Sequence, residues 1–390
     1  MRKIFFIITT LMFFTSSTAL SSQWFGNGTV VYISLVILLS LLAFFKRVEV
    51  KYNPILVLVI SAFTLLCSGA AVINSDAALL YSTIGYIVLF LSTMIVIPSY
   101  FKDSSGKVVI LTIIVSQIPI ILLPIITNGI DSHPYRGIFD NPNSFGGVSA
   151  TVFVVVLAVF LQRLEAFLYT KEKRPRLTVA SLFVLLSLLF LLVIMSGSRT
   201  SFVTCIIAMI VSGLFLLLFT VKHRLIGNLI VKATFVFPLG GLVFWVTNKF
   251  IPIVAFADEV IIRKFANKSG DMLDGRSWVW EKTAGEAGLF GNGNDYFSLH
   301  VGLGAHNTFV SILGQYGWLA VSAFAIIILI GLYYCSIYAL SDNNHKYLPL
   351  LMLITFFALS MGEVMLYKLS MIASFILIGV VANNKKVIIR

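Results

Sequence analysis

Charged residues are scarce in this chain. Asp, Glu, Lys and Arg make up only 11% of its 390 residues, whereas a soluble domain is about one quarter charged. This shortage excludes an ordinary water-soluble fold. Apolar residues are correspondingly abundant. They make up 59% of the chain and recur in runs of about 20, the length that crosses a hydrocarbon core.

Several chemical signatures are also missing. The three cysteines, Cys67, Cys205 and Cys335, all lie inside apolar runs, so neither a disulfide framework nor a metal pair is implied. No GxxxxGK[ST] phosphate loop occurs, which excludes an ATP-driven motor in this chain. No HExxH motif or paired metal-ligand spacing occurs, and the first outer loop has no carboxylate for a cation. We therefore expect no metal and no cofactor.

The apolar runs predict an all-α polytopic membrane protein with about twelve transmembrane helices, folded as a single membrane domain over residues 1–390. The first run also resembles a secretory signal, but we expect a retained helix because the second run follows closely and needs a partner. The expected spans are 4–20, 28–45, 54–73, 79–98, 108–127, 146–162, 178–195, 201–220, 233–250, 308–337, 347–362 and 369–383.

The basic residues test this layout independently. With the N-terminus inside, 19 of the 28 Lys and Arg residues fall on the inner side and 9 on the outer side. The 16 acids divide the other way, with 5 inside and 11 outside. An excess of Lys and Arg in inner loops sets membrane orientation, so both termini are expected in the cytoplasm. The net charge of +12 is thus a topology signal. We expect no nucleic-acid partner, because no basic stripe alternates with base-stacking aromatics.

Two outer connections are long, about 127–144 and 250–305. The second is expected to be one large periplasmic loop, and loops of that length are usually functional or disordered. Its content of Trp, Phe, Gly and mixed charge argues against disorder. We predict a short helix from Arg276 to Ala287 that lies on the membrane, with Trp278 and Trp280 as interfacial anchors.

Arg199 is the most informative outer charge. It stands in SGSRTS, between two long apolar runs, where an ionisable group is costly and suggests function. A guanidinium offers forked donors that match phosphate oxygens, and Ser198 adds a hydroxyl. The alternative is that Arg199 snorkels to the interface or pairs with an outer acid.

Arg136 stands in YRGIFDNPNSFGG, where a turn precedes an expected helix. Asn143 or Ser144 is the candidate N-cap. A helix N-terminus favours anions, so Arg136, Asn141 and Asn143 are candidate substrate-binding residues. For the two asparagines, a plain loop-to-helix cap is the alternative.

His306 is the candidate for acid–base chemistry. It ends VGLGAHN, just where an apolar run begins, and imidazole titrates near neutral pH. Asn307 is a candidate substrate ligand beside it. The alternative is that Asn307 and Thr308 simply cap a helix and leave His306 as an exposed neighbour. His133 and His300 are expected to be solvated loop residues.

Four segments together resemble the O-antigen ligase and O-antigen polymerase superfamily of bacterial surface-polysaccharide assembly. They are RGIFDNPNSFG at 136–146, SGSRTSF at 196–202, DGRSWVWEKT at 274–283 and AHNTFVSILGQYGWLA at 305–320. The last is similar to the family's pattern of histidine, polar residue, nine residues and glycine. Ala320 departs from the Gly, Thr or Tyr common at that position, which weakens a ligase assignment.

The resemblance implies a fold similar to that of C-type glycosyltransferases. It also implies transfer of a glycan from an undecaprenyl-diphosphate carrier to an acceptor sugar hydroxyl at the periplasmic face of the bacterial inner membrane. Arg199 and Arg276, with Arg136 assisting, would hold the diphosphate, and His306 would orient or deprotonate the acceptor. Expected partners are the lipid-linked glycan, the bilayer and chain-length regulator proteins.

Three functions remain open from the sequence. A polymerase of lipid-linked repeat units is favoured, and a ligase that transfers the finished glycan to lipid A–core is the main alternative. A transporter of lipid-linked glycan would need broken helices and charges at the midplane of several spans, whereas these spans carry almost no charge.

Overall fold

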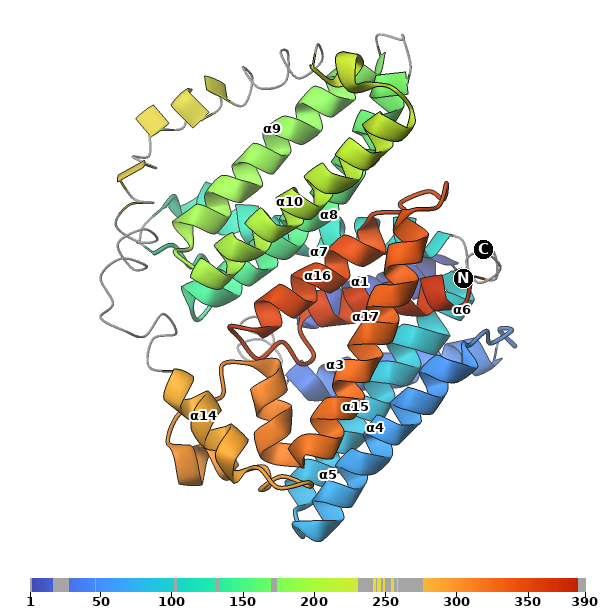
Figure 1. The fold of residues 1–390 in the computed structure, drawn as a ribbon, viewed down its shortest axis with the longest axis vertical. Helices are drawn as coiled ribbons and strands as arrows, with labels where there is room; N and C mark the ends of the chain where they lie inside the picture. The colour runs from blue at the N-terminus through green and yellow to red at the C-terminus, as the bar shows by residue number, and fades with distance from the viewer. Residues whose placement is uncertain are drawn as a thin grey trace.

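A computed structural model describes residues 2–16, 28–45, 47–101, 104–130, 134–169, 174–230 and 276–384, with short pieces between 241 and 258. These residues form helices joined by turns, and no strand occurs among them, which confirms the all-α prediction. The elements, labelled as in Figure 1, are α1 (Arg2–Thr15), α3 (Gly28–Phe45), α4 (Pro54–Ile73), α5 (Ala77–Phe90), the π-helix η1 (Leu91–Val96), α6 (Ile97–Phe101), α7 (Ser105–Asn128), α8 (Pro142–Tyr169), α9 (Arg174–Met195), α10 (Arg199–Lys222), α14 (Ser277–Glu286), the π-helix η4 (Phe297–Val301), α15 (Thr308–Ala339), α16 (Leu348–Ser360) and α17 (Leu369–Ala382).

Seven helices in the described part of the chain are long and apolar enough to cross a membrane. They are Pro54–Ile73, Ala77–Phe101, Ser105–Thr127, Pro142–Tyr169, Leu177–Met195, Arg199–Lys222 and Thr308–Ala339. Four shorter apolar helices lie at the expected first, second, eleventh and twelfth spans. The expected span 233–250 falls largely outside the described residues. A membrane-embedded chain is therefore supported, and the total of twelve spans stays a prediction.

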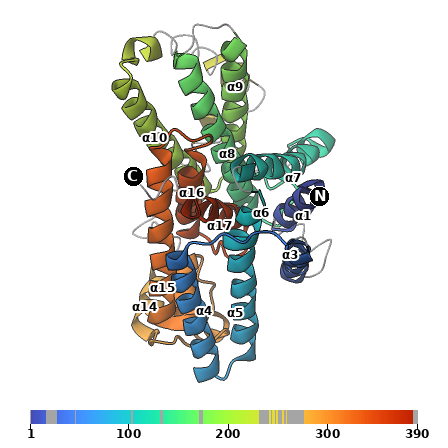
Figure 2. The ribbon, with the colours of Figure 1, turned by 90° about the vertical axis from the view of Figure 1, so that its right-hand side faces the viewer.

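Two short helices, α16 and α17, lie at the centre of the molecule. In Figures 1 and 2, α16 and α17 lie between a group formed by α8, α9 and α10 and a group that contains α4, α5 and the long arm of α15. With 13 and 14 residues, they rise only about 20 Å, less than the thickness of a hydrocarbon core. Nearly every side chain of α17 is buried, so protein rather than lipid surrounds it.

The connections between successive helices lie at two ends of the bundle. A chain that crosses a membrane repeatedly must turn on alternate sides. At one end, the α4–α5 turn bonds to residues 290–294, and residue 135 bonds to Met195 at the end of α9. At the other end, Asn53 donates hydrogen bonds to the Tyr334 hydroxyl and the Ala382 carbonyl, and Lys346 pairs with Glu165 at 3.1 Å. These two sets match the expected outer and inner connections. Which membrane face each occupies stays a prediction.

Residues 276–305, here called the cap, close the first end. Their first part is α14, which confirms the short helix expected from Arg276 to Ala287. Val279 packs with residues 296–305 in a small separate core, and the Trp280 indole donates a hydrogen bond to the Ala305 carbonyl at 3.0 Å. Trp280 is thus an internal anchor of the cap, whereas Trp278 is exposed. In Figure 1, the cap lies beside the start of α15.

One expected span is broken. Residues 308–337 were expected to form a continuous helix, but α15 turns sharply at Gly317, where φ is +86° and ψ is −178°. The cap causes this turn: the amides of Trp318 and Leu319 donate to the carbonyls of Gly288 and Leu289, at 3.2 and 3.3 Å. A Cβ on Gly317 would overlap the backbone of residues 289–291. The turn therefore needs a residue without a side chain.

Replacement of Gly317 by alanine tests this joint. We expect Gly317→Ala to destabilise the protein by at least about 1–3 kcal/mol, because strained backbone and steric overlap add together. The measurement is the melting temperature of the purified protein in detergent. Gly213→Ala is the matched control, since a Cβ there meets no atom within 4 Å. Equal melting temperatures for the two variants would contradict the proposed role of Gly317.

Candidate functional site

The loop between α16 and α17, residues 361–368, is where the candidate residues meet. The carbonyl of Gly362 accepts a hydrogen bond from Arg276 Nη1 at 2.9 Å. The Glu363 carboxylate lies between two partners: Oε1 accepts from Asn143 Nδ2 at 2.9 Å, and Oε2 lies 3.6 Å from His306 Nδ1. Residues from α8, the cap and the start of α15 therefore converge on two adjacent loop residues.

The backbone around His306 is held in an uncommon conformation. His306 has φ of +47°, in the left-handed region that non-glycine residues rarely occupy. Asn307 follows with an extended backbone, and its side-chain oxygen caps α15 by accepting from the amides of Phe309 and Val310 at 2.8 and 3.2 Å. The Thr308 hydroxyl bonds to the carbonyl of Glu363 and the amide of Met365. These bonds fix His306 against the loop while its side chain stays 41% exposed.

Asn307 thus caps a helix, which is one of the two roles that the sequence left open. Its carboxamide caps α15, its Nδ2 lies 3.4 Å from the carbonyl of Met361, and the residue is 2% exposed. Each polar atom of the side chain already has a protein partner. The capping alternative accounts for these contacts, and a direct contact with substrate stays a prediction.

Arg199 is the first residue of α10. Ser198 is its N-cap, and the Ser198 hydroxyl also lies 2.9 Å from the Ser201 hydroxyl. Gly146 allows α8 to approach this turn, because a Cβ there would lie 2.6 Å from the Ser196 hydroxyl oxygen. Thr200, the residue after Arg199, packs against Gly362, whose carbonyl binds Arg276. Two arginines therefore belong to segments that meet at the same glycine, one of them at a helix N-terminus, a combination that favours anions.

The N-cap of α8 differs from the one expected from the sequence. Neither Asn143 nor Ser144 caps the helix: the side-chain oxygen of Asn141 accepts from the Ser144 amide at 2.8 Å, and Pro142 is the first helical residue. Proline fits there because its missing N–H would have no partner within the helix. Asn143 is left free to reach Glu363, so this amide belongs to the site.

Arg136 lies at the same end of the bundle but in its own loop. The amide of Tyr135 donates to the Met195 carbonyl at 2.8 Å, which docks the loop beside the α9–α10 turn. The Arg136 guanidinium bonds to the carbonyl of Asp140 at 3.4 Å. The structure thus brings Arg276, His306 and Asn143 together at residues 362–363, and Asn307 contacts the same loop while it caps α15. Arg199 begins the helix whose next residue, Thr200, packs against Gly362. Arg136, Asn141 and Ser198 are left in local, structural contacts. His133 lies outside the described residues.

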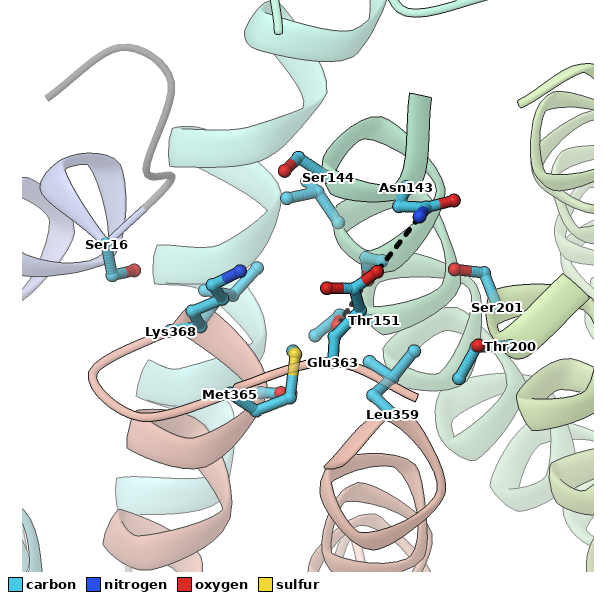
Figure 3. Close-up of a pocket in the computed structure, with 14 residues that line it drawn as sticks. Ser16, Asn143, Ser144, Thr151, Thr200, Ser201, Leu359, Glu363, Met365 and Lys368 are labelled. Atoms are coloured by element: carbon cyan, nitrogen blue, oxygen red, sulfur yellow. Dashed lines mark hydrogen bonds between the residues drawn. The ribbon is translucent and has the colours of Figure 1, made fainter. Parts of the chain in front are cut away.

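A pocket adjoins the meeting point (Figure 3). It is small, with a volume of about 40 Å³, and it is partly open to solvent. The lining comes from the ends of α1 and α16, the starts of α8, α10 and α17, and the loop between α16 and α17. Glu363 and Lys368 both line it, and burial lowers the pKa of the Lys368 ammonium, while the nearby Glu363 carboxylate opposes that shift. Within the described residues, no three His, Cys, Asp or Glu side chains cluster as metal ligands.

Two important residues were missed from the sequence. Glu363 and Lys368 stand in MGEVMLYKLS, a short connection between two apolar runs. A usable signal was present in the sequence, because an acid and a base stand five residues apart between two apolar runs, and ionisable residues within membrane segments usually mark functional sites.

The chain was compared with family models and with curated proteins. No family model matches it, and the curated search gives no match either.

The contact between Glu363 and His306 can be tested by substitution. If the carboxylate orients the imidazole for proton transfer, Glu363→Gln should lower kcat by up to about 10²–10⁴-fold, the contribution of a general base. Under the glycosyltransferase reaction that the resemblance implies, the KM for the lipid-linked donor should stay the same, because the arginines remain. Steady-state kinetics with purified protein would measure both quantities. A Glu363→Gln variant with unchanged kcat would remove Glu363 from the site.

Asn143→Asp serves as a companion variant. It replaces the amide donor to Glu363 by a second carboxylate, and like charges side by side disfavour ionisation of both. We expect lower activity here as well. Asn344→Asp, at the opposite end of the bundle, is the matched control.

Proposed function

We propose that this chain is a membrane glycosyltransferase that moves a glycan from a polyprenyl-diphosphate carrier to a sugar hydroxyl. The observation that carries the proposal is the convergence of Arg276, the His306–Glu363 pair and the first turn of α10, which begins at Arg199, on residues 362–363 at one end of an apolar helix bundle. The site thus combines arginines that can bind a diphosphate with a histidine that can accept a proton from a hydroxyl.

The arginines would bind the leaving group. As the bond between the anomeric carbon and the diphosphate oxygen breaks, the electron pair stays on that oxygen and negative charge grows there. Arg276 is held in place by its bond to the Gly362 carbonyl, so little reorganisation is needed as charge develops. Guanidinium groups can contact two phosphate oxygens at once, which suits both positions.

His306 would accept the proton of the attacking hydroxyl. Its Nδ1 faces the Glu363 carboxylate, which leaves Nε2 to contact the acceptor. A carboxylate on the first nitrogen orients the ring and stabilises the imidazolium formed when the second nitrogen takes a proton. The acceptor oxygen forms its bond to the anomeric carbon as the diphosphate departs. A single displacement of this kind inverts the anomeric centre.

Polymerisation of lipid-linked repeat units in a bacterial inner membrane is the favoured form of this reaction, with the periplasmic face as the side of the cap. Ligation to lipid A–core uses the same chemistry and differs only in its acceptor. Transport of the lipid-linked glycan is the third candidate. The turn at Gly317 is one broken helix of the kind that transporters use, but it lies against the cap rather than at a charged midplane.

A direct assay separates these functions. Purified protein is mixed with a lipid-diphosphate glycan, with and without a lipid A–core acceptor, and the products are sized on a gel. A ladder without added acceptor supports a polymerase, and a single shift only with acceptor supports a ligase. Absence of any covalent product under both conditions would overturn the glycosyltransferase proposal and favour transport.

Substitution of the arginines and the histidine tests the site. We expect Arg199→Ala and His306→Ala to abolish product while the protein still inserts into the membrane. Arg199→Lys should keep only part of the activity, because an ammonium cannot make the forked contact of a guanidinium. Arg163→Ala, an exposed arginine at the far end of α8, is the control for loss of a positive charge. Full activity of both alanine variants would refute this site assignment.

A further inference from the structure

A second and larger cavity lies between α1, α6 and α7, far from Glu363. It is an open groove with a volume of about 450 Å³, within the range of about 300–1,000 Å³ that is usual for ligand sites. The lining residues are Lys3, Phe6, Ile7, Phe101, Ser104 and Val108. Among these lining residues, Lys3 alone is charged, and most of the others are apolar.

Contacts around the groove place it at the end of the bundle that holds the expected inner connections. Ser99, in α6, accepts a hydrogen bond from the Lys51 amide at 2.9 Å and donates one to the Lys51 carbonyl at 3.1 Å. The Asn383 side chain, just after α17, donates to the same carbonyl at 3.0 Å. Phe5 of α1 packs edge to face with Phe101. In Figure 2, α1, α6 and α7 lie side by side near the N-terminus of the chain.

The apolar surface continues from the groove along two neighbouring helices. Ile7 is followed on the same face of α1 by Leu11, and Val108 is followed on the same face of α7 by Leu111 and Val115. Ile7, Leu11, Leu111 and Val115 are all exposed. Because α1 and α7 pack against each other, these side chains extend the groove away from the inner end. A narrow apolar surface of this kind suits a hydrocarbon chain that lies along the helices.

The ammonium of Lys3 marks the polar end of the groove. Lys3 is exposed, and it forms no ion pair with any residue that the structure describes. Lys107, which precedes Val108, is likewise exposed and has no ion-pair partner in the described part of the chain. Lysines close to a membrane surface attract anionic lipid head groups. Charge and shape together therefore indicate a ligand with an anionic head and an apolar tail.

The place of the groove decides between two such ligands. A polyprenyl diphosphate that reacts beside Gly362 would have its anionic group at the opposite end of the bundle from Lys3. A ligand whose anionic group meets Lys3 has its head group at the inner end instead. Anionic phospholipids of the inner leaflet meet this requirement.

We propose that this groove binds one anionic glycerophospholipid of the inner leaflet, with an acyl chain between α1 and α7 and the phosphate on Lys3. The site is separate from the proposed glycosyltransferase site and does not depend on that function. A lipid held here would cover part of the exposed apolar face of α1 and hold this helix against α7.

Two substitutions test the groove and the head-group contact separately. Ile7→Trp places a larger side chain in the groove, and its matched control is Ile210→Trp on α10, because Ile7 and Ile210 are 55% and 58% exposed. Lys3→Gln removes the charge. Its control is Lys222→Gln, which removes an exposed lysine at the end of α10.

The measurement is lipid binding to the full-length protein in detergent, followed by native mass spectrometry. The protein is titrated with phosphatidylglycerol or with phosphatidylcholine that carries the same acyl chains. We expect the first phosphatidylglycerol to bind at least about fivefold more tightly than phosphatidylcholine, the contribution of one lysine near a lipid head group. Lys3→Gln should remove this preference.

Ile7→Trp should weaken the binding of both lipids by at least about tenfold, which corresponds to about two methylene groups that are no longer buried. Ile210→Trp and Lys222→Gln should behave as the unsubstituted protein.

Each part of the inference has its own contrary result. The same preference for phosphatidylglycerol in Lys3→Gln as in Lys222→Gln would overturn the head-group contact, and equal affinities in Ile7→Trp and Ile210→Trp would overturn the groove. Displacement of phosphatidylglycerol by an equal concentration of undecaprenyl phosphate would assign the groove to the carrier and overturn the inference. None of these measurements uses glycan transfer, so failure of the proposed function would leave their outcome unchanged.

Discussion

The carboxylate of Glu363 is the point on which the rest of the site depends. Its two oxygens contact Asn143 from α8 and His306 from the start of α15, while its own carbonyl accepts from Thr308. A carboxylate taken from water into a partly closed site is costly unless several donors and cations compensate it. Here the compensating groups are the proposed ligands of the reaction. The contacts that hold the loop in place are therefore the same contacts that position the proposed catalytic groups.

The first arm of α15, residues 308–316, is fixed at both of its ends. At the start, Asn307 and Thr308 tie it to residues 361–365, and at the end, the backbone of residues 288–293 binds the turn at Gly317. The left-handed backbone of His306 costs of order 1–3 kcal/mol and persists only because these contacts determine it. A small movement of the cap would thus shift the imidazole, which makes the cap part of the geometry of the proposed catalytic site.

Much of the helical framework was predictable, because long apolar runs leave helices as the main way to satisfy the backbone in lipid. Arg199 and His306 stood out in the sequence because each is an ionisable residue at the edge of an apolar run. Partners remote in sequence were not predictable: Asn143 and Glu363 lie 220 positions apart, and only the fold brings them into contact. The break in α15 was missed for a similar reason. Gly317 is an ordinary helix residue by composition, and its turn is imposed by carbonyls of the cap.

The groups around Glu363 also suggest how the proposed reaction would be arranged. Arg276 binds the carbonyl of Gly362, and Thr200, next to Arg199 at the start of α10, packs against the same glycine. Burial lowers the pKa of the Lys368 ammonium, and the nearby Glu363 carboxylate opposes that shift. In the proposed reaction, a diphosphate would meet the arginine-bearing segments beside Gly362, and His306 would act from the adjacent Oε2 of Glu363.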